Sequence, residues 1–251
     1  RMRALVTLGR ESLQARADEQ VVGTIPDHDD ADAMRDDVRV LSLLSGSLGL
    51  RIAGPDFDPY YAYSGGYGYT WFRDDAEIST FVFEADQKLG LGLDDWHERS
   101  ARAYCQTQRD DGSWPHRVWP FDGSLAPGWA NARLESGDDV DYQADQTGSV
   151  IAFLATYYGD CEDPSLRADI EATLELALDS LDETLGDDGL PVDCQNAWEN
   201  MTGRFSHTTA TFLEAYAALA LSDLDSDLTD RAATRAREVY EGVDALWREE
   251  R

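Results

Sequence analysis

Apolar side chains recur at helical spacing along most of this chain. In the segment 164–185, Leu166, Ile170 and Leu174 begin a series that continues three or four residues at a time. That spacing places the series on one face of an amphipathic helix. Comparable patterns predict helices over residues 3–17, 32–44, 75–88, 94–108, 145–158, 205–221 and 228–248. Almost nothing has the alternation of a long strand, so the pattern predicts an all-α protein with about seven or eight helices.

Three long segments between these helices, 54–74, 110–142 and 186–204, interrupt any period and are rich in Tyr, Trp and Gly. Connections longer than about 12–15 residues without secondary structure are usually functional when they are not disordered. Their aromatic content argues against disorder. We therefore expect a helical scaffold whose three aromatic loops form one shared site.

The composition is that of an ordered protein with an extreme acidic charge. The 251 residues are 42% apolar, and 50 acidic against 21 basic residues give a net charge of −29. Lys88 is the sole lysine, and the acids are spread from Asp18 to Glu250 rather than gathered in a tail. Molar salt shortens the Debye length to about 3 Å and relieves such self-repulsion. We expect adaptation to high salt rather than an acidic interaction surface, and no nucleic-acid partner.

The cysteine spacing and the lack of a long apolar run point to a reduced, cytoplasmic setting. The three cysteines, Cys105, Cys161 and Cys194, show no CxxC spacing, and no apolar run is long enough to span a membrane. The chain opens on Arg and closes within helical periodicity, so we expect both ends to be cuts through a longer protein, and export by an upstream signal stays open. No metal or other cofactor is expected.

The first candidate constellation lies where the loop 54–74 runs into a helix. Its sequence, Tyr69-Thr70-Trp71-Phe72-Arg73-Asp74-Asp75, sets aromatic rings beside a guanidinium and carboxylates. An aromatic face suits the apolar side of a sugar ring, while Arg and Asp can bind neighbouring hydroxyls. The alternative is that Asp74 or Asp75 simply caps the following helix.

Two further constellations occupy the other loops. Gln143 and Asp145 again stand where a loop meets a helix, and Asp145 could be either a ligand residue or a helix cap. In Ala197-Trp198-Glu199-Asn200 a glutamate lies beside an indole, which would raise its pKa and suit it to donate a proton. The alternative is an ordinary solvated loop glutamate.

The order and spacing of these segments resemble the glucoamylase-type family of inverting glycoside hydrolases, family 15, whose members are (α/α)6 barrels with the sugar pocket in long loops at one end. Trp71-Phe72-Arg73-Asp74 matches the family's aromatic-x-Arg-Asp motif, which binds the terminal glucose. The resemblance implies that Arg73 and Asp74 clasp hydroxyls of that sugar. Trp71 or Tyr69 would form a pocket wall.

The other two segments carry the remaining implied roles. Tyr142-Gln143-Ala144-Asp145 resembles a segment that lines the pocket, which assigns Gln143 and Asp145 to substrate binding. Trp198-Glu199 resembles the start of the family's Trp-Glu-Glu, so Glu199 would be the general acid and Trp198 a pocket residue. Asn200 replaces the second glutamate and would keep a hydrogen-bonding group there.

The resemblance also implies that the second catalytic carboxylate is missing from residues 1–251. Inversion needs a second carboxylate about 6.5–9.5 Å from the acid to activate water. In the family this base lies in the last third of the barrel, beyond residue 251. We therefore expect residues 1–251 to form an incomplete (α/α)6 toroid, a partial catalytic domain that requires its C-terminal remainder and is inactive alone.

The function expected from the resemblance is exo-acting, inverting hydrolysis of terminal α-glucosidic bonds in maltooligosaccharides or starch-like glucans. Hydrolysis of trehalose by the same fold is one alternative, since a single glucose subsite would serve both substrates. A non-catalytic carbohydrate-binding or regulatory barrel is another, because the base is not seen.

Overall fold

The computed structural model describes residues 12, 15, 22–55, 66–126, 143–197 and 201–247. Within these residues the regular structure is seven α-helices, one short 3₁₀ helix and a single pair of two-residue strands. The all-α prediction is confirmed; the predicted helix 3–17 falls almost wholly outside the described residues. The elements are α3 (Ala31–Leu44), β1 (Thr70–Trp71), α4 (Phe72–Leu89), α5 (Asp94–Thr107), β2 (Arg117–Val118), α7 (Asp145–Tyr158), α8 (Pro164–Glu183), α9 (Ser206–Ala220), α10 (Ser226–Gly242) and η2 (Val243–Leu246).

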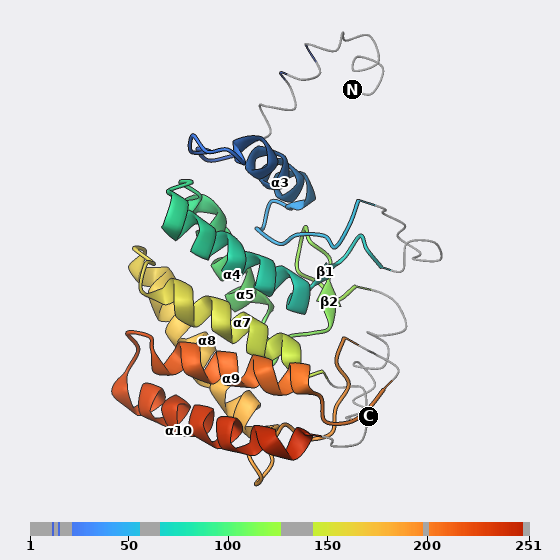
Figure 1. Ribbon diagram of the computed structural model, residues 1–251, viewed down its shortest axis with the longest axis vertical. Coiled ribbons are helices and arrows are strands. Elements are labelled where there is room, and N and C mark those ends of the chain that lie inside the picture. Colours follow the sequence, from blue (N-terminus) through green and yellow to red (C-terminus); the bar gives the residue numbers. More distant parts are fainter. Residues whose placement is uncertain are drawn as a thin grey trace.

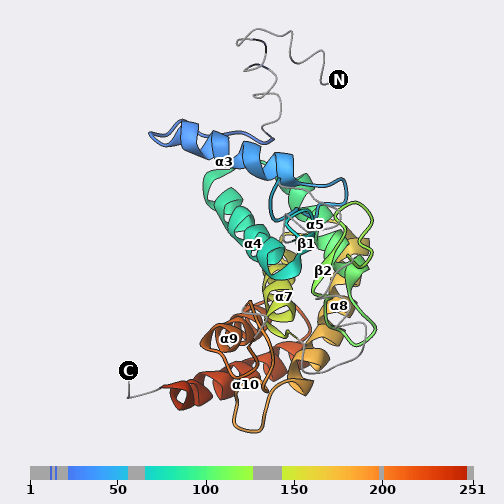
Figure 2. The same cartoon turned by 90° about the vertical axis from the view of Figure 1, so that its right-hand side faces the viewer.

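The helices are arranged in layers. Helices α4, α7 and α9 lie side by side and run in the same direction, with their N-terminal ends toward β1 and β2 (Figure 1). Helices α5 and α8 form a second layer behind them (Figure 2). Helix α10 packs against α9 and is tied to α8, since Arg231 on α10 donates to Asp179 at 2.6 Å and to Asp182 at 2.8 Å.

Helix α7 is the centre of the packing. Of its residues only Thr156 is not buried, as expected for a helix that is apolar on every side after its first turn. It lies between α4 and α9. Gly148 permits the approach to α9, because a Cβ at this position would lie 2.9 Å from the carbonyl oxygen of Thr211. Among the described helices, none combines the length and apolarity needed to cross a bilayer.

The helix ends exclude the alternative, left open by the sequence, that Asp74, Asp75 or Asp145 is a helix cap. Helix α4 begins three residues earlier than predicted, after Trp71, so Asp74 and Asp75 lie in its first turn and neither is its cap. Helix α7 has Ala144 at its cap position, and Asp145 is its first helical residue. By contrast, Asp163 does cap α8, where its carboxylate accepts from the backbone N–H of Ser165 at 2.8 Å.

The three predicted loops are joined at one end of the helical layers. Strand β1, from the first loop, pairs antiparallel with β2 from the second, with Thr70 opposite Val118. An isolated parallel bridge links Gln143, at the end of the second loop, to Gln195 in the third. These contacts place described parts of all three loops beside the N-terminal ends of α4, α7 and α9 (Figure 1).

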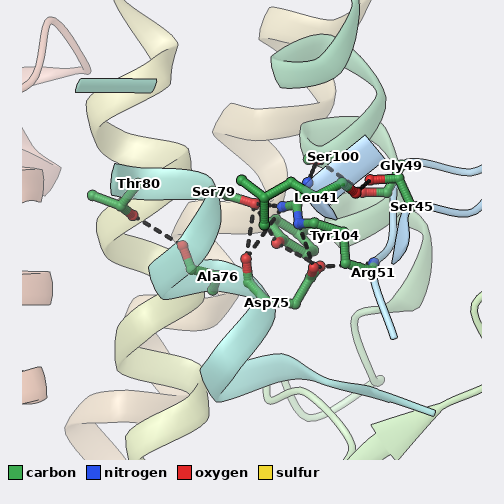
Figure 3. A network of polar contacts seen from close by, with 10 residues as sticks. All are labelled: Leu41, Ser45, Gly49, Arg51, Asp75, Ala76, Ser79, Thr80, Ser100 and Tyr104. Atoms are coloured by element: carbon green, nitrogen blue, oxygen red, sulfur yellow. Dashed lines mark hydrogen bonds and ion pairs between the residues drawn. The ribbon is translucent and has the colours of Figure 1, made fainter. Parts of the chain in front are cut away.

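A buried polar network anchors the first turn of α4 (Figure 3). Arg51 Nε lies 2.9 Å from Asp75 Oδ1, and the Tyr104 hydroxyl donates to Asp75 Oδ2 at 2.8 Å. The guanidinium also donates to the hydroxyls of Ser79 and Ser100. Burial raises the pKa of Asp75, although Arg51 and Tyr104 oppose this effect. The network fixes the rotation of α4 about its axis, and so the direction in which its other face points.

Candidate active site

Three helix N-terminal ends meet around one carboxylate. Arg73 is the second residue of α4, Asp145 the first of α7 and His207 the second of α9. Arg73 Nη1 lies 3.4 Å from Asp145 Oδ2, and His207 Nδ1 lies 3.5 Å from the same oxygen. The parallel direction of the three helices brings these side chains together, although they are far apart in the sequence.

Gln143 completes the contacts of Arg73. Arg73 Nη1 donates to Gln143 Oε1 at 3.0 Å, and the Gln143 side chain is fully buried. Its Nε2 has no hydrogen-bond partner among the described residues. A buried amide N–H without a partner costs free energy, so Gln143 keeps an unused hydrogen-bond donor beside Arg73.

Glu77 lies one helical turn beyond Arg73 and faces His207. His207 Nε2 is 4.0 Å from Glu77 Oε1, so each ring nitrogen of His207 faces one carboxylate. Burial raises the pKa of Glu77, and the nearby charge of Asp74 adds to this while His207 opposes it. The hydrogen bond to Asp145, assisted by the charges of Asp145 and Glu77, raises the pKa of His207.

The aromatic residues of the first constellation have different environments. Tyr69 is completely buried, with its ring 4.7 Å from that of Trp119. Trp71 is partly exposed; its indole N–H donates to the Gly66 carbonyl at 3.1 Å, and Arg117 lies 4.9 Å from its ring centre. Trp71 thus keeps some exposed surface and Tyr69 does not, and which of the two forms a pocket wall stays a prediction.

Asp74 and Arg73 have different neighbours. Asp74 is exposed, and with Trp71 it lines a small cavity of about 110 Å³ between α3 and α4. Arg73 instead contacts Gln143 and Asp145. The expectation that Arg73 and Asp74 clasp the same sugar stays a prediction, whereas the contact of Arg73 with the second constellation is a structural fact.

The third constellation, Trp198, Glu199 and Asn200, lies outside the described residues. Its described flanks pair with each other and with Gln143 of the second constellation. Cys194 and Gly203 exchange two backbone hydrogen bonds of 3.1 Å each, and Gln195 bridges to Gln143. Cys194 and Gln195, on the N-terminal flank, therefore lie beside Gly203 and Gln143 respectively.

Sequence reasoning missed Glu77 and His207. Glu77 follows Arg73 by four residues within one helix, a spacing that places both on the same face. His207 opens the helix that follows the third loop, as Asp145 opens the one that follows the second. These positional signals are present in the sequence, but nothing in a one-dimensional pattern pairs a residue of α4 with one of α9.

The cluster offers hydrogen bonding rather than metal ligation. Across the described residues, no group of three or more His, Cys, Asp and Glu side chains is arranged to hold a metal ion. A guanidinium fork, an amide with an unused N–H and two carboxylates can instead recognise a ligand with several neighbouring hydroxyls.

Solved glycosidases share this all-α, toroid-like fold. A glycosidase variant with a glutamate-to-alanine substitution matches with a TM-score of 0.54 and 18% identity over 95% of this chain. Another glutamate-to-alanine variant, in complex with glucose, matches with a TM-score of 0.56 and 17% identity. This chain spans 59% of the length of each. No family model and no curated protein sequence matches the chain. The likeness establishes a glycosidase fold.

Proposed function

We propose that this chain is part of a glycoside hydrolase of the glucoamylase type, which removes glucose from the non-reducing ends of maltooligosaccharides or starch-like glucans with inversion. The observation that carries the proposal is the contact of Arg73 with Gln143 and Asp145, which joins two sequence constellations at the loop end of a glycosidase fold. The glucose bound by one of the solved glycosidases supports the choice of sugar.

The binding step follows from the donors and acceptors of the cluster. Arg73 and the unused N–H of Gln143 donate to hydroxyl oxygens of the terminal sugar, and Asp145 accepts from a hydroxyl. Trp71 offers its ring to the apolar face of the sugar, and Asp74, Trp198 and Asn200 contribute further contacts. Binding at several hydroxyls orients the glycosidic bond for attack.

In the chemical step Glu199 is the general acid. It protonates the glycosidic oxygen as the bond to the anomeric carbon breaks, while a water attacks that carbon from the opposite face. A carboxylate outside residues 1–251 takes the proton of this water, so the 251-residue chain by itself does not turn over substrate. Its partner in catalysis is the remainder of the barrel, and it works in the cytoplasm at molar salt.

Sugar binding tests the proposal without requiring turnover. Arg73→Met is compared with Arg35→Met, since Arg35 forms an exposed pair with Asp32 at 2.7 Å on α3. Calorimetric titration with maltotriose in molar KCl should show affinity at least about tenfold weaker for Arg73→Met, because a charge-assisted contact is lost. The control should bind like the wild type. Equal affinity of all three proteins, or no binding by the wild type, would contradict the proposal.

Turnover is tested in the protein extended through the sequence that follows Arg251. NMR of the first product should show β-glucose, and Glu199→Gln should lower kcat by at least about a hundredfold. Release of the α-anomer would contradict inversion. Faster hydrolysis of trehalose than of maltotriose would instead identify a trehalase. Sugar binding without any turnover would identify a non-catalytic carbohydrate-binding barrel.

A further inference from the structure

We propose that His207 is a positioning residue for the sugar-binding carboxylate of Asp145, and that sugar binding therefore requires the protonated form of His207. This inference rests on the proposed function, because it concerns the same site. It adds a residue that the sequence constellations do not contain and a dependence on pH that they do not imply.

The geometry makes His207 a bridge between two helices. Its Nδ1 lies 3.5 Å from Asp145 Oδ2 on α7, and its Nε2 lies 4.0 Å from Glu77 Oε1 on α4. Asp145 is fully buried, whereas the His207 and Glu77 side chains are each a little under half exposed. His207 thus contacts the same oxygen of Asp145 as Arg73 does, and it does so from a third helix.

The charges around His207 come from all three helices. On α4 they are Arg73, Asp74 and Glu77; on α7 the facing group is Asp145; on α9 itself Glu214 lies two turns further on. The carboxylates outnumber the one arginine. The balance of these charges favours the imidazolium, in agreement with the raised pKa of His207.

Protonation decides whether both contacts can be made at once. An imidazolium donates from both ring nitrogens, so it can serve Asp145 and Glu77 together. Neutral imidazole keeps one N–H, and the lone pair of its other nitrogen then faces a carboxylate. Loss of the proton therefore turns an attraction into a repulsion on one side of the ring and weakens the hold on Asp145, which is then left with its contacts to Arg73 and to the backbone N–H of Gln146.

The sign of the pH effect follows. Because the pKa of His207 is raised above its usual value of about 6.5, the bridge is complete below that pH and is lost as the pH rises through the raised pKa. Sugar affinity should be highest in mildly acid to neutral solution and should fall on the alkaline side. A charge-assisted contact of this kind corresponds to about a tenfold change in affinity.

The first measurement concerns His207 without sugar. The Cε1–H resonances of the four histidines are followed by NMR from pH 5 to 9 at fixed salt, and His207 is assigned by its absence in His207→Asn. Glu77→Gln and Asp145→Asn should each lower the pKa of His207, while the pKa of His28, which faces only the exposed Asp30 at 3.6 Å, should not change. An unchanged His207 pKa in both variants would overturn the bridge.

The second measurement is maltotriose affinity over the same pH range. We expect the wild type and the control His28→Ala to bind about tenfold more weakly at pH 9 than at pH 6. His207→Ala should bind weakly at every pH, and His207→Asn, whose amide is neutral like the deprotonated imidazole, should bind at every pH about as weakly as the wild type does at pH 9. Loss of the pH dependence in a variant that keeps a donor toward Asp145 is a result that a purely structural role of His207 would not give.

The outcomes separate the two proposals. If the wild type binds maltotriose but His207→Ala keeps its affinity and its pH profile, the positioning role is overturned and the proposed function stands. If the wild type binds no sugar at any pH, the proposed function fails, and with it the role of His207 toward sugar; the NMR titration still tests the bridge.

Discussion

Two arginine–aspartate pairs on opposite faces of α4 differ in what surrounds them. Arg51 and Asp75 are 2.9 Å apart with side chains only 4% and 1% exposed, and Arg73 and Asp145 are 3.4 Å apart with 11% and 0% exposed. The two members contributed by α4, Arg73 and Asp75, are separated by a single residue. Since successive helical residues are about 100° apart, they point to nearly opposite sides of the helix.

The difference lies in the groups that surround each pair. Around Asp75 and Arg51 the hydroxyls of Tyr104, Ser79 and Ser100 form hydrogen bonds with the pair, although Arg51 Nε itself makes none among the described residues (Figure 3). Around Arg73 a buried amide N–H of Gln143 has no partner among the described residues. The same ion-pair chemistry thus serves as a structural anchor where buried hydroxyls surround it, and as a candidate ligand site where it lies beside partly exposed side chains, Arg73 and His207, at the loop end of the helices.

The largest effect on stability is expected from Arg51→Met. Removing one member of a buried pair leaves an uncompensated carboxylate and costs about 3–5 kcal/mol of the free energy of unfolding. Urea denaturation at fixed salt measures this cost. Arg35→Met is the matched control, because its pair with Asp32 is exposed and should contribute less than about 1 kcal/mol. Similar losses in the two variants would show that the Arg51 pair is no anchor.

A smaller effect is expected from Tyr104→Phe. The ring keeps its place against Phe153, but Asp75 loses a 2.8 Å hydrogen bond from the hydroxyl. A hydrogen bond to a charged group contributes about 1.5–3 kcal/mol, and the free energy of unfolding should fall by that amount. Tyr240→Phe, at a side chain 68% exposed, provides the comparison and should be neutral. An unchanged free energy of unfolding in Tyr104→Phe would show that this hydrogen bond does not contribute to the anchor.

The smallest stability effect should come from Arg73→Met, the variant expected to affect sugar binding. Asp145 would keep its contact with His207 and the backbone N–H of Gln146 at 3.0 Å, so we expect a loss of about 1 kcal/mol. The same urea titration measures it. A loss as large as that of Arg51→Met would make the Arg73 pair a second anchor and remove the contrast between the two faces of α4.

Helix positions could be predicted wherever the local pattern is unambiguous. The prediction of 145–158 agrees with α7, and that of 164–185 ends within two residues of α8, whose start is marked by Asp163 and Pro164. The start of α4 was missed, because Tyr69 to Phe72 has the composition of an aromatic loop. In the structure Phe72 is a buried core residue of the first turn.

The candidate site could be predicted in part. Arg73, Gln143 and Asp145 were singled out from local chemistry and spacing, and the structure brings them into contact. Glu77 and His207 were not singled out, because they come from two different helices and no periodicity in the sequence indicates that they are in contact. The resemblance assigned Trp71 or Tyr69 to a pocket wall, which stays a prediction, but the contacts of the buried Tyr69 with Trp119 and Arg117, from a different loop, could not be predicted from the sequence.

The sequence by itself determined the helical scaffold, the excess of acidic residues and the residue types at the three loop–helix junctions, because these follow from local periodicity and composition. Only the tertiary structure decided that the N-terminal ends of α4, α7 and α9 meet, that Asp75 turns inward to Arg51 while Arg73 turns to Asp145, and that His207 completes the cluster. The physical reason is that packing three parallel helices through the buried α7 sets which residues become neighbours, and no short stretch of sequence contains that information.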